Sequence, residues 1–368
     1  MKNREVKKEG DLLEVGGFFE FSEFDCKRYE KSALFYLKNI HRNHSFFRDG
    51  RQAIKSILLN TEKLKDKICY LPSYLCYSIS QPFKELKLEV NFYNHRHSLK
   101  PLIQENIKNS LIFIVDYFGT EYISKERIYD FLNKGNIIIL DVTHSLLDRD
   151  RLKIKSKNLY LIASLRKIFP IPDGGVLYHS DSQFTAKKAS PRGYEEMLEA
   201  MKLKESYLKE KSKIIPKNIK NRFLKIYQKY ENDKDSNLIK LQNIPAISLD
   251  ILKNINILNI IRKRKRNLEF MYKNISNKKH LLFNLNEIKS PFILLLVFEN
   301  EEKRNAIKKL LIENNIYPPI HWDLEKIVPK GYLFEHQLSK RILSIPIDQR
   351  YNEKNLSRVI NILNSNSL

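Results

Sequence analysis

Short apolar runs alternate with helical segments over the first half of the chain. Such runs begin at Ile68 and cover Leu111–Tyr117, Asn136–Leu140 and the stretch from Leu159 to Ala163. They are nearly continuous in apolar residues, which is typical of strands buried on both faces. Helical spacing follows several of them, as in Lys125–Asn133. The pattern predicts an α/β fold, in which a large, mostly parallel sheet has helices on both faces.

The second half of the chain has a different pattern. Residues 180–250 are polar and rich in lysine, and the periodicity predicts helices over Tyr194–Lys211 and Ile219–Tyr230 with a loop at Asn232–Asn237. A single long helix is expected from Ser248 to Asn274. Later strands and helices predict a small α+β unit; they are Pro291–Phe298, Glu301–Asn314, Ile316–Tyr317, Ile342–Ile347 and a helix from Asn352. We therefore expect a large domain over 1–247 and a small C-terminal domain over 248–368.

A glycine pair stands beside clustered aromatic residues near the N-terminus, in Val15–Phe21. This segment reads either as a turn followed by an edge strand or as a loop that lines a pocket. The turn chemistry favours the first interpretation and does not exclude the second.

Charge suggests a basic surface. The chain has a formal net charge of +23, and its densest basic block is Arg262–Arg266, within an amphipathic helix. Such a charge suits nucleic acid or an anionic membrane surface. Here the lysines are scattered among isoleucine and asparagine, so we discount both partners, and a basic surface would equally suit a phosphorylated or nucleotide-linked small substrate.

The cysteines and histidines bear on the cellular compartment of the protein and on whether it binds a metal. Cys26, Cys69 and Cys76 form neither a disulfide framework nor a CxxC pair, which indicates a reducing cytoplasm. The apolar runs are strand-sized, so no membrane span is expected. His41, His44, His95 and His97 lack metal-ligand spacing, and no metal site is predicted.

Polar residues follow the predicted strands, at the edge where a parallel sheet binds ligands. Lys167 lies in a short loop between two apolar runs, and Asp141 ends another run. Burial and Arg166 favour a neutral Lys167 amine, and a buried Asp141 needs a cationic partner such as a pyridinium. The helix that begins near Gly50 offers free N–H groups to a phosphate. Together these groups suit pyridoxal 5'-phosphate, with Lys167 as its Schiff-base lysine.

The order of these motifs resembles the fold-type I pyridoxal phosphate enzymes, and most closely the DegT/StrS-type sugar aminotransferase family. Asp49–Ile54 looks like the family's phosphate loop, and Leu71–Tyr74 looks like its Val-Pro-Ser-Phe segment. Leu140–Ser145 looks like its Glu-Asp-Ala-Ala-His motif. The resemblance implies that Asp141 contacts the pyridine nitrogen, that His144 lies near the ring hydroxyl and that Lys167 is the catalytic lysine.

The chain departs from the family pattern at several positions. Arg51 stands where the family usually has threonine, so a guanidinium is expected to help hold the phosphate. Cys76 stands where a stacking aromatic residue is usual, which leaves Tyr74 or Tyr77 for that role. Ser164 precedes Lys167 by three residues, a spacing that in other fold-type I aminotransferases places the serine on the phosphate. These differences indicate a divergent branch.

The C-terminal part contributes three residues that are candidates for binding the substrate. His321 and Trp322 resemble a His-Tyr pair that approaches the active site in the family, and a packed domain interface is the alternative. Arg350 is a candidate clamp for a donor carboxylate, and a surface salt bridge is its alternative.

The resemblance implies a homodimeric aminotransferase that moves an amino group, with glutamate as its donor, to a keto group. The acceptor it suggests is a nucleotide-linked sugar for surface polysaccharide. Three alternatives stay open: another pyridoxal phosphate reaction such as a lyase or dehydratase, a non-catalytic relative, and a nucleic-acid binder.

Overall fold

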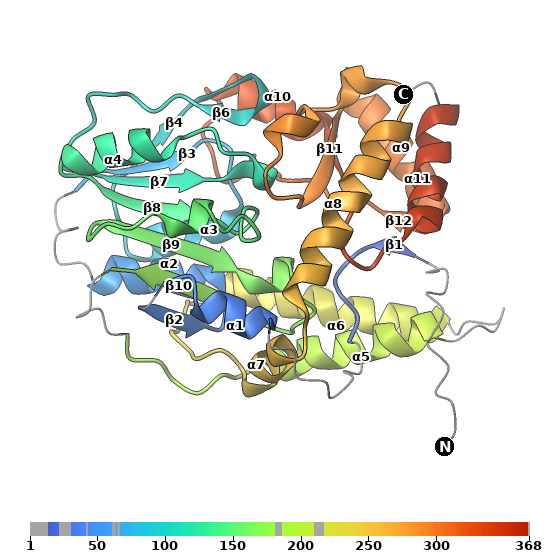
Figure 1. Cartoon of the computed structure of the whole chain (residues 1–368), viewed down its shortest axis with the longest axis horizontal. Helices are drawn as coiled ribbons and strands as arrows, with labels where there is room; N and C mark the ends of the chain where they lie inside the picture. The colour runs from blue at the N-terminus through green and yellow to red at the C-terminus, as the bar shows by residue number, and fades with distance from the viewer. Residues whose placement is uncertain are drawn as a thin grey trace.

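A seven-stranded sheet forms the larger part of the molecule (Figure 1). The computed structural model describes residues 14–21, 31–41, 43–60, 64, 67–180, 186–209 and 217–366. The sheet runs in the order β2 (His44–Phe47), β10 (Gly175–His179), β9 (Leu159–Ser164), β8 (Ile137–Asp141), β7 (Leu111–Val115), β3 (Cys69–Pro72) and β4 (Val90–Tyr93). Strand β10 points in the opposite direction to the other six strands, so its pairings with β2 and β9 are antiparallel and all the others are parallel. The predicted α/β fold with a mostly parallel sheet is confirmed.

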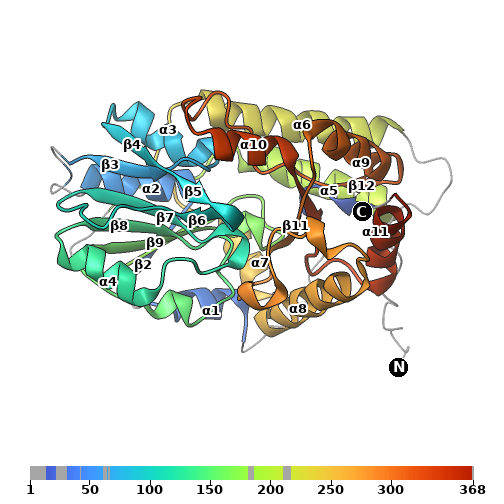
Figure 2. The same cartoon turned by 90° about the horizontal axis from the view of Figure 1, so that it is seen from above.

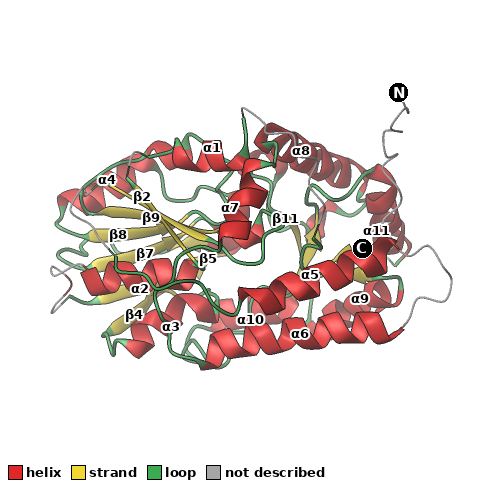
Figure 3. Cartoon of the chain, turned by 90° about the horizontal axis from the view of Figure 1, so that it is seen from below, coloured by secondary structure: helices red, strands yellow, loops and turns green. Residues whose placement is uncertain are grey.

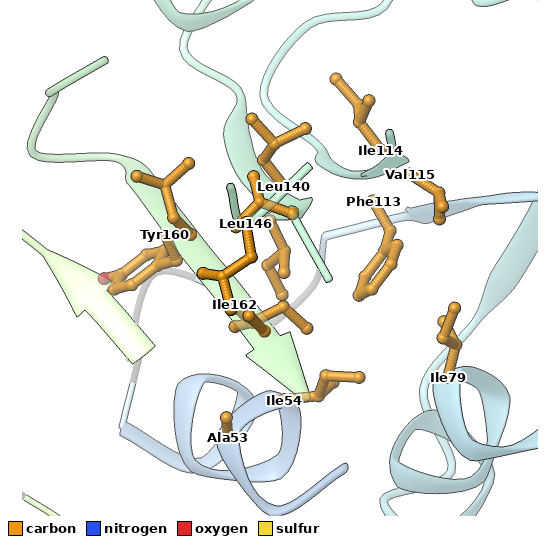
Figure 4. Packing of buried hydrophobic residues seen from close by; sticks show 14 of the residues in the cluster. Ala53, Ile54, Ile79, Phe113, Ile114, Val115, Leu140, Leu146, Tyr160 and Ile162 are labelled. Atoms are coloured by element: carbon orange, nitrogen blue, oxygen red, sulfur yellow. The ribbon is translucent and has the colours of Figure 1, made fainter. Parts of the chain in front are cut away.

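Helices cover both faces of this sheet. Figures 2 and 3 show α2 (Gly50–Asn60) and α3 (Tyr77–Glu85) on one face, with α1 (Ala33–Lys38) and α4 (Lys125–Asn133) on the other. Figure 4 shows the packing beneath α2 and α3, where apolar side chains of both helices meet those of β7, β8 and β9. Each aliphatic side chain fully buried in this core stabilises the fold by about 1.5–3 kcal/mol. This packing holds the start of α2 at the carboxyl edge of the sheet.

A close backbone approach explains the glycine at the start of β10. A Cβ atom on Gly175 would lie 2.4 Å from the carbonyl carbon of Asp49. Only a residue without a side chain lets the turn before α2 approach the strand this closely. Gly175 therefore sets the position of Gly50.

Replacing Gly175 by alanine is expected to lower the free energy of unfolding by about 1–3 kcal/mol, because the new methyl group must push the Asp49 backbone away. Denaturant unfolding monitored by circular dichroism measures this loss. Gly331→Ala is the matched control, because a Cβ there meets no atom within 4 Å. Equal stability of the two variants would contradict the argument.

A second, smaller core lies beside the sheet (Figure 1). Its strands are β11 (Ile293–Val297), antiparallel to β13 (Ile342–Pro346), and β12 (Ile316–Tyr317). Its helices are α8 (Ile257–Asn274), α9 (Glu301–Glu313) and α11 (Glu353–Ser365). Helix α10 (Leu333–Arg341) lies between β12 and β13 in the chain, and its buried Leu338 packs in the main core. Strand β1 (Val15–Gly16) pairs in parallel with β12, so this segment contains the expected strand, but the strand precedes the bend at Gly17 and does not follow it. The domain boundary at 247/248 stays a prediction.

The predicted loop at Asn232–Asn237 is wrong for most of its length. Helices α5 (Tyr194–Lys209) and α6 (Lys217–Ser236) form an antiparallel hairpin, and α6 continues through the predicted loop. Ion pairs from the last turns of α6 to the sheet domain stabilise this extension; they join Glu231 to Arg166, Lys234 to Asp49 and Asp235 to Arg51. Such distant partners are not visible in the local pattern.

The single helix expected from Ser248 to Asn274 is also wrong. The structure has α7 (Ala246–Lys253) and α8, with a break between them. The Asn256 side chain accepts a hydrogen bond of 3.2 Å from the Asn259 N–H and so caps the start of α8. Asparagine favours this cap over a helix interior.

A short ribbon of β5 (His95–Arg96) and β6 (Lys100–Pro101) completes the described elements. None of the described helices combines the length and hydrophobicity needed to cross a bilayer.

Candidate active site

The carboxyl ends of β8 and β9 and the start of α2 enclose a cavity of about 160 Å³. It brings together nine of the residues proposed from the sequence: Gly50, Arg51, Tyr77, Asp141, His144, Ser164, Lys167, His321 and Trp322. They come from both halves of the chain. Parallel strands place their last residues at one edge, and the small domain supplies the opposite wall.

Lys167 lies at the end of a 3₁₀ turn that follows β9. Its side chain is exposed to the cavity although it lies within the body of the protein. Within the described part of the chain, the amine has no hydrogen-bond or ion-pair partner. Burial lowers the pKa of this amine, and the Arg166 guanidinium lowers it further. Arg166 itself is paired with Glu231 at 2.8 Å. The site therefore favours a neutral, nucleophilic Lys167.

Asp141 is a carboxylate without a cationic partner among the described residues. One of its oxygens accepts a hydrogen bond of 2.9 Å from the Thr143 N–H. Burial raises the pKa of Asp141 to about 6, and Asp116 adds to the rise, while hydrogen bonds from Thr143 lower this pKa and oppose the effect. A cationic ligand group beside this oxygen would restore the charged form.

The start of α2 and the end of β9 form an anion-binding corner of the cavity. A Cβ on Gly50 would lie 3.5 Å from the Cβ of Ser164, so the helix terminus faces this serine closely. The Ser164 hydroxyl has no hydrogen-bond partner among the described residues. Free N–H groups at a helix N-terminus and a free hydroxyl suit a phosphate group.

Helix α6 closes this corner, which the sequence reasoning did not anticipate. One terminal nitrogen of Arg51 donates to Gln81 at 2.7 Å and to Asp235 at 2.9 Å. Lys234 bridges Asp49 and Asp173 at 3.0 Å each, with only 7% of its side chain exposed. Lys234 overcomes the opposing effect of burial and lowers the pKa of Asp49 to about 2. The only signal in the sequence was that Glu231 and Asp235 lie four residues apart, which places them on one face of α6.

Two histidines in the wall are held neutral. The His144 ring stacks on Phe292 with centroids 4.1 Å apart, and its Nδ1 accepts the Phe118 N–H at 3.1 Å. Burial lowers the pKa of His144 well below its usual range. His321 Nδ1 lies 2.7 Å from the Ser344 hydroxyl, and burial lowers the His321 pKa to about 3. Neither ring adds positive charge beside Lys167.

The two tyrosines proposed for ring stacking lie in different places. Tyr77 begins α3 and lines the cavity. Tyr74 is fully buried, its hydroxyl donates to the His321 carbonyl, and its ring packs against Trp322 at 5.6 Å. Tyr74 therefore supports the cavity wall from behind. Tyr77 and Trp322 are the aromatic rings that face the cavity.

A larger cavity of about 370 Å³ adjoins the first, and Arg166, Lys167 and His321 line both. Its walls come from segment 14–21, the α5–α6 hairpin and the small domain. Apolar and aromatic side chains predominate, with convergent charged groups, as in small-molecule sites of this size. The pocket interpretation of Val15–Phe21 therefore applies, and the strand interpretation applies in part: an edge strand is followed by residues that line a pocket.

Arg350 also lines the larger cavity, but its guanidinium is engaged. It forms two hydrogen bonds of 2.8 Å to Asp348, and it contacts Glu20 at 3.3 Å and the carbonyls of Gly17 and Phe18. These contacts hold segment 14–21 in place. The clamp for a donor carboxylate stays a prediction for this residue.

Among the described residues, no group of three or more histidine, cysteine or carboxylate side chains is arranged to hold a metal ion. His41 lies 2.7 Å from the Leu152 carbonyl, and His95 packs against Glu335 at 3.1 Å. These histidines serve the packing of the fold.

The sequence of this chain matches no protein-family model and no curated protein. Solved structures match over most of the chain. A DegT DnrJ EryC1 StrS aminotransferase from Brucella abortus is 15% identical, covers 90% of this chain and 89% of its own, and has a TM-score of 0.61.

Two further matches have similar values. DesV of S. venezuelae, solved in complex with a ketimine intermediate, is 11% identical over 90% of this chain and 86% of its own, with a TM-score of 0.60. The sugar aminotransferase CalS13 from Micromonospora echinospora is 12% identical over 90% and 91%, with a TM-score of 0.59. These structural neighbours are sugar aminotransferases of the kind that the sequence motifs resemble, and they confirm the predicted fold.

Proposed function

We propose that this chain is a pyridoxal phosphate-dependent aminotransferase, a divergent relative of the DegT/StrS-type sugar aminotransferases. One observation carries the proposal: Lys167, an amine without a hydrogen-bond or ion-pair partner among the described residues, and Asp141, a carboxylate without a cationic partner among them, line one cavity at the ends of adjacent strands. Burying an amine and a carboxylate that both lack a charged partner costs free energy unless a ligand supplies the missing partners.

The residues of the cavity fit this cofactor. Lys167 would hold it covalently, and Asp141 would pair with its ring nitrogen. Gly50, Arg51 and Ser164 would hold its phosphate at the start of α2. His144, Tyr77 and Trp322 are the rings available beside the cofactor ring.

The cofactor supplies, when bound, an electron sink for a carbanion next to the substrate nitrogen. The Lys167 amine accepts the proton from the donor Cα and later returns a proton to the acceptor carbon. Asp141 holds negative charge beside the ring nitrogen throughout. The α5–α6 hairpin lines the larger cavity and Trp322 lines the smaller one, so both would help to exclude water from the reacting carbon.

The substrates follow from the resemblance and from the relatives. Glutamate is the proposed amino donor, and the keto group of a nucleotide-linked sugar for surface polysaccharide is the proposed acceptor. The 370 Å³ cavity beside Lys167 has room for the sugar ring that carries this keto group. A homodimer in the cytoplasm is the proposed state of the enzyme.

Loading the purified chain with pyridoxal phosphate tests the proposal. A visible absorbance band is expected, and borohydride should fix the cofactor on the peptide that contains Lys167, as mapped by mass spectrometry. Glutamate should then be converted to 2-oxoglutarate in a half-reaction. Capture on another lysine would contradict the assignment of the site. Capture without release of an oxo acid from any amino acid would indicate another pyridoxal phosphate reaction.

A further inference from the structure

Six cationic side chains line the larger cavity: Arg166, Lys167, Lys204, Lys220, Arg264 and Arg350. Four of them have a carboxylate within 4 Å. Arg166 pairs with Glu231, Lys204 with Glu20, Lys220 with Glu14 and Arg350 with Asp348. In the described part of the chain, Lys167 and Arg264 have none.

Arg264 is buried in the wall, with 1% of its surface exposed. Its Nε donates to the Gln349 amide oxygen at 2.8 Å, and one terminal nitrogen donates to the Phe292 carbonyl at 3.0 Å. The other terminal nitrogen has no partner among the described residues. Burial without a paired carboxylate lowers the pKa of Arg264 to about 10, although Asp348 opposes this effect. A buried guanidinium in this state is a strong site for an anion.

Gln349 fixes Arg264 relative to the reactive lysine. Its amide nitrogen donates to the carbonyl of Ile168, the residue after Lys167, at 2.8 Å, while its oxygen accepts from Arg264. Phe292 provides a second connection, because its carbonyl binds Arg264 and its ring stacks on His144. One side chain therefore links the free arginine nitrogen to the Lys167 turn.

We propose that Arg264 binds a carboxylate of the amino donor while the donor's amine lies at Lys167. This assignment rests on the proposed function and names its donor class as a carboxylate-bearing amino acid. One free nitrogen suits one oxygen of a singly charged carboxylate. A doubly charged phosphate needs more unpaired cations, and apart from Lys167 the other four cationic side chains of this cavity already have carboxylate partners.

Binding of 2-oxoglutarate, measured by calorimetry with and without pyridoxal phosphate, tests the proposal. Arg264→Gln is expected to weaken binding by about 10- to 100-fold, the value of a charged hydrogen bond. Arg264→Lys keeps the charge and should show a smaller loss. Arg262→Gln, an exposed residue of the same helix, should bind as the wild type does. Thymidine diphosphate binding should be equal in all four proteins.

Several results would overturn this role. They are equal 2-oxoglutarate affinity in Arg264→Gln and wild type, loss of thymidine diphosphate binding instead, and absence of 2-oxoglutarate binding to wild type. Thermal unfolding checks the fold of each variant. If Arg264→Gln does not fold, Arg264→Lys decides, and an affinity equal to wild type there counts against the proposal. Cofactor capture at Lys167 is measured separately, so failure of the proposed function is distinguishable from failure of this inference.

Discussion

Lys167→Ala is expected to abolish covalent capture of pyridoxal phosphate and to lower transamination by at least about 1,000-fold. The variant removes the only cavity-lining amine that lacks a partner among the described residues. Lys234, the other lysine in the wall of the smaller cavity, is held by Asp49 and Asp173 and cannot replace it. Stopped-flow absorbance with glutamate measures the rate, and borohydride labelling measures the capture.

Two controls make the Lys167 result specific. Lys153→Ala changes an exposed lysine paired with Asp150 and should leave the rate unchanged. Lys167→Arg keeps a long side chain but replaces the neutral amine with a permanently charged guanidinium that is no nucleophile, so it should be as inactive as the alanine variant. Full activity in either Lys167 variant would disprove the proposed mechanism.

Asp141→Asn is expected to lower activity by roughly 100- to 1,000-fold while the protein still captures the cofactor, because an amide cannot stabilise a protonated ring nitrogen. The single-turnover rate with glutamate measures this loss, with labelling of Lys167 as the check on loading. Asp148→Asn is a suitable control, because that carboxylate accepts hydrogen bonds in an exposed turn outside the cavity. An Asp141→Asn variant with the wild-type rate would remove Asp141 from the site.

At neutral pH the same substitution is expected to stabilise the cofactor-free protein, although it lowers the activity. The pKa of Asp141 is raised to about 6 by burial, so the folded state binds this proton more tightly than the unfolded state. Stability from this group is therefore lost as the pH rises from about 4 to 8, by on the order of 2 kcal/mol. Asp141→Asn should lack this part of the pH dependence. Denaturant unfolding of both proteins across that range measures the difference.

Much of the fold was predictable because local patterns carried it. The apolar runs at Leu111, Asn136 and Leu159 are buried on both faces, so their strands needed no knowledge of distant partners. Asp141 and Lys167 were recognisable because polar residues that follow buried strands gather at one sheet edge. The extension of α6 and the break before α8 were missed, since remote ion pairs and a side-chain cap decided them against the local periodicity.

The sequence by itself determined where the buried strands lie and which polar residues follow them. It also identified Lys167 and Asp141 as an amine and a carboxylate that need partners. Only the tertiary structure decided which charges are already neutralised. Lys234, Arg350 and Arg264 are equally basic in the sequence, yet two of them lie against carboxylates and the third does not. Pairing depends on which side chains share a buried space, and that is set by the packing of segments far apart in the chain.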